Sequence, residues 1–168
     1  MFKSNFNIIV GGNNTWKTSF LHNFSYELKE KFNKRIIFIS SIIDGDNKNS
    51  SFMNNRYYLH RSISYRFDYE TPGITVLKTI EEICKREKID FIFIDDIEFM
   101  NEKHLEILKR IPIIKIATST KNFDFIDSTN YYIEKEYKNG KHSTMINNID
   151  ITSLIKSYIR DEKLKTII

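Results

Sequence analysis

Short apolar runs alternate with segments of helical periodicity along the first two thirds of the chain. A run that is apolar on both faces and rich in β-branched residues is typical of a strand in a parallel sheet that helices cover on both sides. We therefore expect strands at Phe6–Val10, at Arg35–Ser41, within Asp90–Met100, where the run turns acidic at Asp95 and Asp96, and at Ile113–Thr118.

Helical patterns fill the intervals between these runs. Apolar residues recur at helical spacing, with charged residues mostly on the opposite face, from Lys17 onward and again over Thr75–Lys88. Asn101 is suited to cap a shorter helix over Glu102–Arg110. Because strand–helix–strand connections are right-handed, this alternation predicts a parallel sheet with helices packed against it.

The remaining segments depart from this alternation. Ile42–Gly73 has no clean period, and we expect an irregular excursion there. Two alternating runs flank Asn139-Gly140, which is a strong hairpin signal, and Asp150 can cap a last helix. The sequence thus predicts a single α/β domain over residues 1–168, with three layers and a mostly parallel sheet that ends in an antiparallel carboxy-terminal hairpin.

Composition sets only broad limits. The 168 residues are 40% apolar and 29% charged, which is ordinary for a globular domain, and they contain no apolar run of about 18 residues that would span a membrane. The first residues lack the basic, apolar and small-residue order of a secretory signal peptide. The single cysteine, Cys84, is expected to be buried and inert, and it cannot form a disulfide within the chain. We therefore expect a reducing, cytoplasmic location. The net charge of +4 is a weak hint of a polyanionic partner.

The first loop carries the candidate chemistry. Gly11, Lys17 and Thr18 match the phosphate-loop pattern G-x-x-x-x-G-K-[ST], and only Trp16 departs, because it stands where the second glycine is expected. Such a loop binds phosphates through backbone N–H groups and the lysine, and its hydroxyl binds Mg²⁺, while Asp95 is placed to hold the same ion. ATP and Mg²⁺ are the expected cofactors, and the expected binding residues are Gly11, Gly12, Asn13, Asn14, Thr15, Trp16, Lys17, Thr18 and Ser19. The alternative is a flavodoxin-like sheet with a chance lysine.

These motifs and their order resemble a known family. The resemblance lies in the segments IIVGGNNTWKTSFLHNFSYELKEKFNKRIIFIS, FIFIDDIEFM and IIKIATST. They are similar to the RecA-like ATPase domain of DnaB-type replicative helicases and their KaiC relatives, with a degenerate Walker A motif. The resemblance implies that Lys17 binds phosphate, that Thr18 and Asp95 hold Mg²⁺, with Asp95 as the Walker B carboxylate, and that Ser119 or Thr118 is a sensor residue. It also implies partners, either further copies of the chain or other replication proteins.

The chain departs from this family at further positions. A side chain at Trp16 costs about 1–2 kcal/mol if its backbone is left-handed, and the ring can stack on a base, plug the site or pack on neighbouring structure. Ile42 lies near the place of the family's water-activating glutamate. The acids that can substitute for that glutamate are Asp96, Glu98 and Asp44. The family's basic residues after the hairpin, which reach a neighbouring subunit, are replaced by Asn147 and Asn148.

Nucleic acid is a further candidate ligand. The stretch NNRYYLHRSISYRFDY interleaves arginines with aromatic rings, a mixture suited to phosphate contacts and base stacking, although it equally suits a loop packed on a sheet. Lys121 and Asn122 lie where RecA-like proteins keep a loop that faces DNA. The histidines have no ligand spacing, and we expect no zinc.

Two main functions follow from these features. The first is an ATP-binding protein of DNA replication or recombination, with weak hydrolysis and with single-stranded DNA as a partner. The second is a degenerate relative that binds nucleotide, or serves in assembly, without turnover. A small-molecule kinase is a third reading, but it usually needs an arginine-rich lid, which the sequence does not show.

Overall fold

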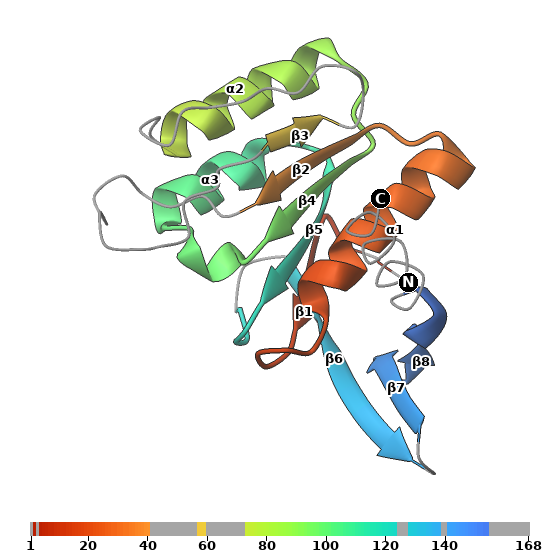
Figure 1. The fold of residues 1–168 in the computed structure, drawn as a ribbon. Coiled ribbons are helices and arrows are strands. Elements are labelled where there is room, and N and C mark those ends of the chain that lie inside the picture. Colours follow the sequence, from red (N-terminus) through yellow and green to blue (C-terminus); the bar gives the residue numbers. More distant parts are fainter. Residues whose placement is uncertain are drawn as a thin grey trace, which may run out of the picture.

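The computed structural model describes residues 2, 4–40, 57–59, 73–123, 128–138 and 141–154. Helices and strands alternate through the first part of this chain, and strands dominate its end (Figure 1). In chain order the elements are β1 (Phe6–Val10), α1 (Lys17–Phe32), β2 (Ile36–Ser40), β3 (Tyr57–Leu59), α2 (Gly73–Arg86), β4 (Phe91–Asp95), the 3₁₀ helix η1 (Ile97–Phe99), α3 (Glu102–Arg110), β5 (Ile114–Ser119), β6 (Ser128–Lys138), β7 (Lys141–Ile146) and β8 (Ile149–Asp150).

The strands form one mixed sheet in the order β3-β2-β4-β5-β1-β6-β7-β8. The five central strands, from β2 to β6 in this order, pair in parallel, whereas β3 at one edge and β7 and β8 at the other pair antiparallel. The predicted parallel core with an antiparallel carboxy-terminal hairpin is confirmed. Lys138 of β6 pairs with Lys141 of β7, so the two predicted runs pair as a hairpin, while Asn139-Gly140 itself lies outside the described residues.

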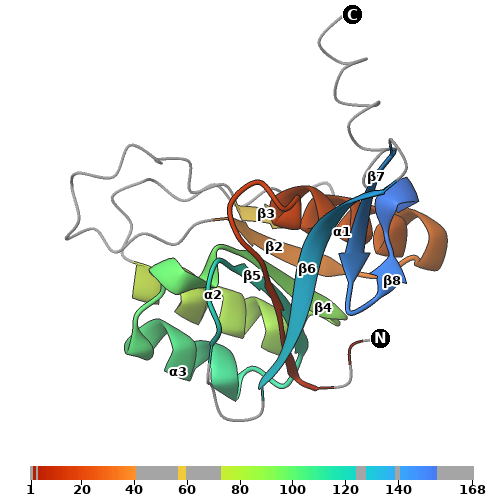
Figure 2. The ribbon, with the colours of Figure 1, turned by 90° about the horizontal axis from the view of Figure 1, so that it is seen from below.

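Helices cover both faces of the sheet. Figure 2 shows α1 on one face and α2 with α3 on the other. The alternating side chains of β2 explain this layering, because Ile37 and Ile39 pack into the core under α2 and α3, whereas Ile36 and Phe38 pack into the core under α1. Strands β1, β2, β4 and β5 therefore bury side chains on both faces, as expected for strands that are mostly apolar.

The structure differs from the predicted elements in three places. The run within Asp90–Met100 is a strand only to Asp95, because the backbone of Asp96 is left-handed (φ 54°) and turns the chain into η1. A short strand, β3, lies inside the segment for which we expected no regular element. Asn147 and Asn148 adopt left-handed conformations (φ 45° and 66°) and turn the chain from β7 into the unpredicted β8.

The last predicted helix is described only at its beginning. Residues 152–154 are helical, and the Asp150 carboxylate accepts a hydrogen bond from the Thr152 amide (2.8 Å), as expected of a capping residue. Within the described residues, no helix is long and apolar enough to cross a membrane. Cys84 is half-buried, and burial raises the pKa of its thiol to about 11, so the thiol stays protonated near neutral pH.

Strand β6 holds the two parts of the sheet together. Its first half pairs with β1 and its second half with β7, and the resulting hairpin projects beyond the rest of the sheet (Figure 1). Where β1 ends, Gly11 lies so close to β6 that a Cβ atom added there would be 2.4 Å from Cγ2 of Ile133 and 2.9 Å from its carbonyl oxygen. Only glycine fits at this position without displacing the backbone of β6.

We therefore predict that Gly11→Ala destabilises the protein by about 1–3 kcal/mol, the usual cost of overpacking. Gly12→Ala is the matched control, because nothing lies within 4 Å of a Cβ atom added at Gly12. Urea unfolding measures both variants. Equal unfolding free energies for the two variants would contradict the close packing of β1 on β6.

Candidate phosphate-binding site

The loop between β1 and α1 has a strained backbone. Asn14 (φ 60°) and Trp16 (φ 67°) are both left-handed, and Trp16 directly precedes the first residue of α1. Asparagine tolerates this conformation, whereas a bulky residue such as tryptophan rarely adopts it. The Thr15 hydroxyl donates to the Gly12 carbonyl oxygen (2.8 Å) and helps to close the loop. The backbone thus has the left-handed conformation that a glycine would favour, although the glycine is absent.

Lys17 is buried at the start of α1, with 8% of its surface exposed. Its Nζ atom donates to the carbonyl oxygens of Gly11 (2.7 Å) and Gly12 (2.9 Å). A buried ammonium group must be hydrogen-bonded, and these loop carbonyls supply its partners. The charge of Lys17 is therefore held within the loop, at the amino-terminal end of a helix, where anions are favoured.

Asp95 links the loop to the sheet. Because Ile94 of β4 pairs with Ala117 of β5, Asp95 lies beside Thr118. The Asp95 carboxylate is buried, and its Oδ1 atom accepts hydrogen bonds from the hydroxyls of Thr118 (2.6 Å) and Thr18 (3.1 Å). The Thr118 hydroxyl in turn accepts from the Asp96 amide (2.8 Å). The predicted metal ligands, Thr18 and Asp95, are therefore in direct contact.

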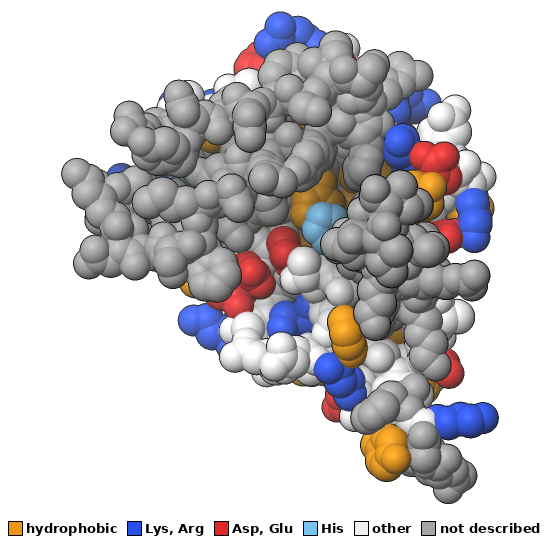
Figure 3. Space-filling model, in the orientation of Figure 1, with side chains coloured by type: hydrophobic (Ala, Val, Ile, Leu, Met, Phe, Trp, Pro, Cys, Tyr) orange, Lys and Arg blue, Asp and Glu red, His pale blue; other side chains and the backbone are white. Residues whose placement is uncertain are grey.

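Of these residues, Lys17, Thr18 and Asp96 line a cavity of about 450 Å³. It lies at the carboxyl ends of the parallel strands, where β1 has β5 on one side and β6 on the other, which is where open α/β sheets bind ligands. In the space-filling view, acidic and basic side chains lie near one another below the centre of this face (Figure 3). The described lining residues are Asn13, Asn14, Thr15, Trp16, Lys17, Thr18, Ser19, Asp96, Thr120 and Lys135.

The predicted water-activating acids fall in different places. Asp96 lines the cavity, and burial, followed by the charges of Asp95 and Glu98, raises the pKa of its carboxyl to about 6, while Lys17 acts in the opposite direction. A carboxylate with this pKa can accept a proton near neutral pH. Glu98 instead accepts hydrogen bonds from the amide (2.9 Å) and hydroxyl (2.8 Å) of Thr120. Asp44 lies outside the described residues, as does Ile42.

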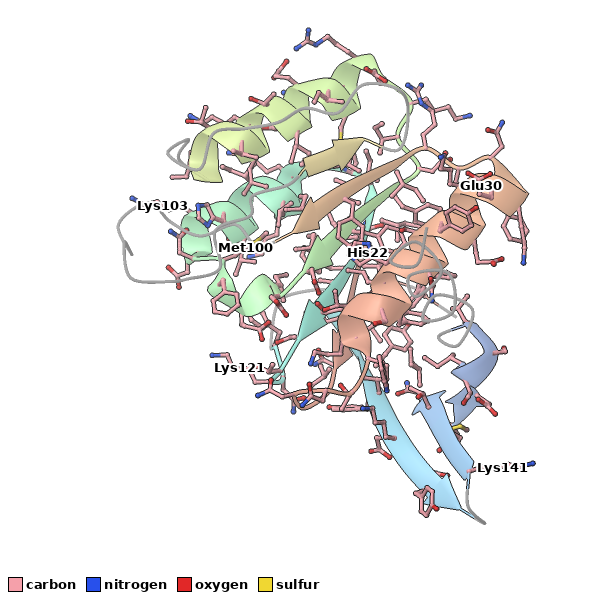
Figure 4. The ribbon with its side chains drawn as sticks, viewed as in Figure 1. His22, Glu30, Met100, Lys103, Lys121 and Lys141 are labelled. Carbon is pink, nitrogen blue, oxygen red and sulfur yellow. The ribbon has the colours of Figure 1, made fainter. Side chains whose placement is uncertain are left out.

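The two candidate sensor residues have different neighbours. Thr118 contacts Asp95, whereas the Ser119 hydroxyl donates to the carbonyl oxygen of Lys121 (2.8 Å) and lies one position further along β5. Lys121 and Asn122 are exposed after the end of β5, and Figure 4 shows Lys121 at the rim of the sheet. The basic and aromatic stretch at 54–69 lies almost wholly outside the described residues.

Lys135 is a site residue that the sequence did not reveal. Its Nζ atom lies 4.7 Å from the centre of the Trp16 ring, and both side chains line the cavity. Trp16 is 39% exposed and lines the cavity, so its ring is not buried in the core. In the sequence Lys135 is one of two lysines in an alternating strand, and only the pairing of β6 with β1 brings it to the loop.

The described residues suit a magnesium-bound polyphosphate. Mg²⁺ is usually held by one or two protein oxygens together with phosphate oxygens, and the Thr18 hydroxyl and the Asp95 carboxylate provide such a pair. In the described part of the chain, no group of three or more His, Cys, Asp or Glu residues is placed to hold a metal ion. A site for a fully protein-coordinated ion is thus not seen among those residues.

Comparison with known proteins identifies the fold. The sequence matches no protein-family model and no curated protein. Among solved structures, the chain is similar to a KaiC-like protein from the hyperthermophilic archaeon Pyrococcus horikoshii, with a TM-score of 0.55, 15% sequence identity, and coverage of 90% of this chain and 83% of that one. At this identity the similarity shows the fold alone. The chain has a RecA-like α/β fold.

We predict that Trp16→Gly is more stable than Trp16→Ala by about 1 kcal/mol, because both variants lose the indole and only alanine keeps a Cβ atom on a left-handed backbone. Urea unfolding measures the difference. At Thr15, which is not among the residues with positive φ, the same pair of substitutions should show the opposite order. Finding alanine the more stable residue at position 16 would show that the loop is not left-handed there.

Proposed function

We propose that this chain binds ATP with Mg²⁺ in the cavity between the β1–α1 loop and the end of β4. The observation that carries this proposal is the contact between Thr18 and Asp95 (3.1 Å) beside the buried ammonium group of Lys17. A hydroxyl, a carboxylate and a lysine at the start of a helix are the groups that a P-loop uses for a magnesium-bound triphosphate. The RecA-like fold supports the same function.

Each group then has a defined role. The Lys17 ammonium exchanges the carbonyl oxygens of Gly11 and Gly12 for phosphate oxygens, and the loop amides and the amino-terminal end of α1 stabilise the remaining negative charge. Thr18 and Asp95 hold Mg²⁺, which neutralises charge on the phosphates. Thr118 positions the Asp95 carboxylate through its short hydrogen bond (2.6 Å).

We propose that hydrolysis is weak or absent. Asp96 lines the cavity and is the candidate base. It lies on the turn after β4, however, whereas the family's water-activating glutamate lies near the position of Ile42, which follows β2 in the sequence. Asn147 and Asn148 form the β7–β8 turn, and Asn147 exchanges hydrogen bonds with the backbone of Tyr132, so these residues have a structural role in place of a cationic one. A missing trans-acting cation typically lowers phosphoryl-transfer rates by about 10³–10⁵-fold.

We propose a role in DNA replication or recombination. We also propose assembly with further copies of the chain or with other replication proteins. Both proposals rest on the family resemblance. Lys121 and Asn122 are exposed at the same edge of the sheet as the cavity, which suits contact with single-stranded DNA.

Calorimetry with ATP and Mg²⁺ tests the binding proposal. We expect Lys17→Ala to weaken binding at least about tenfold, because it removes a charged hydrogen-bond donor from the phosphates. Thr18→Ala should reduce the gain in affinity that Mg²⁺ provides. Lys141→Ala is the matched control, since this exposed lysine lies at the far end of the hairpin (Figure 4). Unchanged affinity in Lys17→Ala would overturn the proposal.

A further inference from the structure

Strand β6 brings a second lysine to the cavity. Ile133 of β6 packs on Gly11, where β1 ends. Side chains two positions apart on a strand face the same way, so Lys135 follows Ile133 on the loop side of β6. Its backbone is held in the sheet by pairing with Thr144 of β7. The position of Lys135 is therefore set by the sheet and not by a free loop.

The indole of Trp16 holds the Lys135 side chain over the cavity. The Nζ atom lies 4.7 Å from the ring centre, within the range of a cation–π interaction. The described ion pairs do not include Lys135, so no carboxylate in that part of the chain neutralises it. The charged side chains among the described lining residues are Lys17, Lys135 and Asp96.

We propose that Lys135 is a second phosphate-binding residue of this cavity, acting within the same chain and positioned by the ring of Trp16. The inference rests on the proposed nucleotide binding and goes beyond it, because it assigns a residue outside the loop motif. It also explains what Trp16 contributes to the site. In place of the glycine that the motif expects, the loop has an aromatic ring that directs the Lys135 ammonium group toward the ligand.

Calorimetry with two probes, ATP and inorganic tripolyphosphate, each with Mg²⁺, tests this inference. Lys135→Met keeps most of the side-chain length and removes the charge, Lys135→Arg keeps the charge, and Lys141→Met is the control for the loss of one positive charge elsewhere on the hairpin. We expect Lys135→Met to weaken binding of both probes by about three- to tenfold, which is the effect expected for a charge–charge contact that is partly exposed to solvent. Lys135→Arg should keep most of the wild-type affinity.

The role of Trp16 is tested by a double-mutant cycle. The factor by which Lys135→Met weakens binding should shrink toward one in a Trp16→Gly background, because Lys135 is then no longer positioned. Trp16 is the only tryptophan, so its fluorescence reports on Lys135 directly, and we expect the emission of the free protein to change in Lys135→Met but not in Lys141→Met.

Failure of the proposed function and failure of the inference are distinguishable. If the wild-type protein binds neither probe, the proposed function fails, and the inference fails with it. If wild type binds both probes and Lys135→Met binds them equally well, only the inference is overturned, and Lys135 is an ordinary surface lysine resting on a ring. If Lys135→Met weakens ATP but not tripolyphosphate, Lys135 contacts the nucleoside, and the phosphate role is wrong.

Discussion

The close contact between Gly11 and Ile133 is the constraint on which the candidate site depends. It brings the end of β1 against β6 at a distance that no Cβ atom would allow. The chain then turns into α1, whose first residues reach Asp95 at the end of β4. On the other side, β6 continues past Ile133 to Lys135. The pairing of β1 with β6 therefore gathers the loop, Asp96 after the end of β4, and Lys135 of β6 around one cavity.

The β1–α1 loop holds Trp16 in a backbone conformation that glycine favours. The backbone at Trp16 is left-handed, which costs a non-glycine residue about 1–2 kcal/mol. The bond from the Phe20 amide to the Trp16 carbonyl begins α1, and the bonds from Lys17 to the two glycine carbonyls fix the loop from the inside. Together these hydrogen bonds hold the loop in its strained conformation, and the Trp16 ring lies at the wall of the cavity.

Local patterns in the sequence were sufficient for the order of the elements, the loop motif and the acid at the end of β4. They were insufficient where the register between paired strands determines which distant residues lie side by side. Thr118 and Ser119 are adjacent, and only the pairing of Ile94 with Ala117 places Thr118 beside Asp95. Lys135 became a candidate only through the pairing of β6 with β1. The strands β3 and β8 are too short for any periodicity, and the left-handed turn at Asp96 ended a strand although apolar residues follow it.

The proposed binding of a magnesium-bound nucleotide by the β1–α1 loop can be seen in a crystal structure with a non-hydrolysable ATP analogue and Mg²⁺. We expect the Lys17 Nζ atom to leave the carbonyl oxygens of Gly11 and Gly12 for phosphate oxygens, with Mg²⁺ beside Thr18 and Asp95. A structure at saturating analogue in which Lys17 keeps both carbonyl bonds and the Trp16 ring fills the cavity would contradict it.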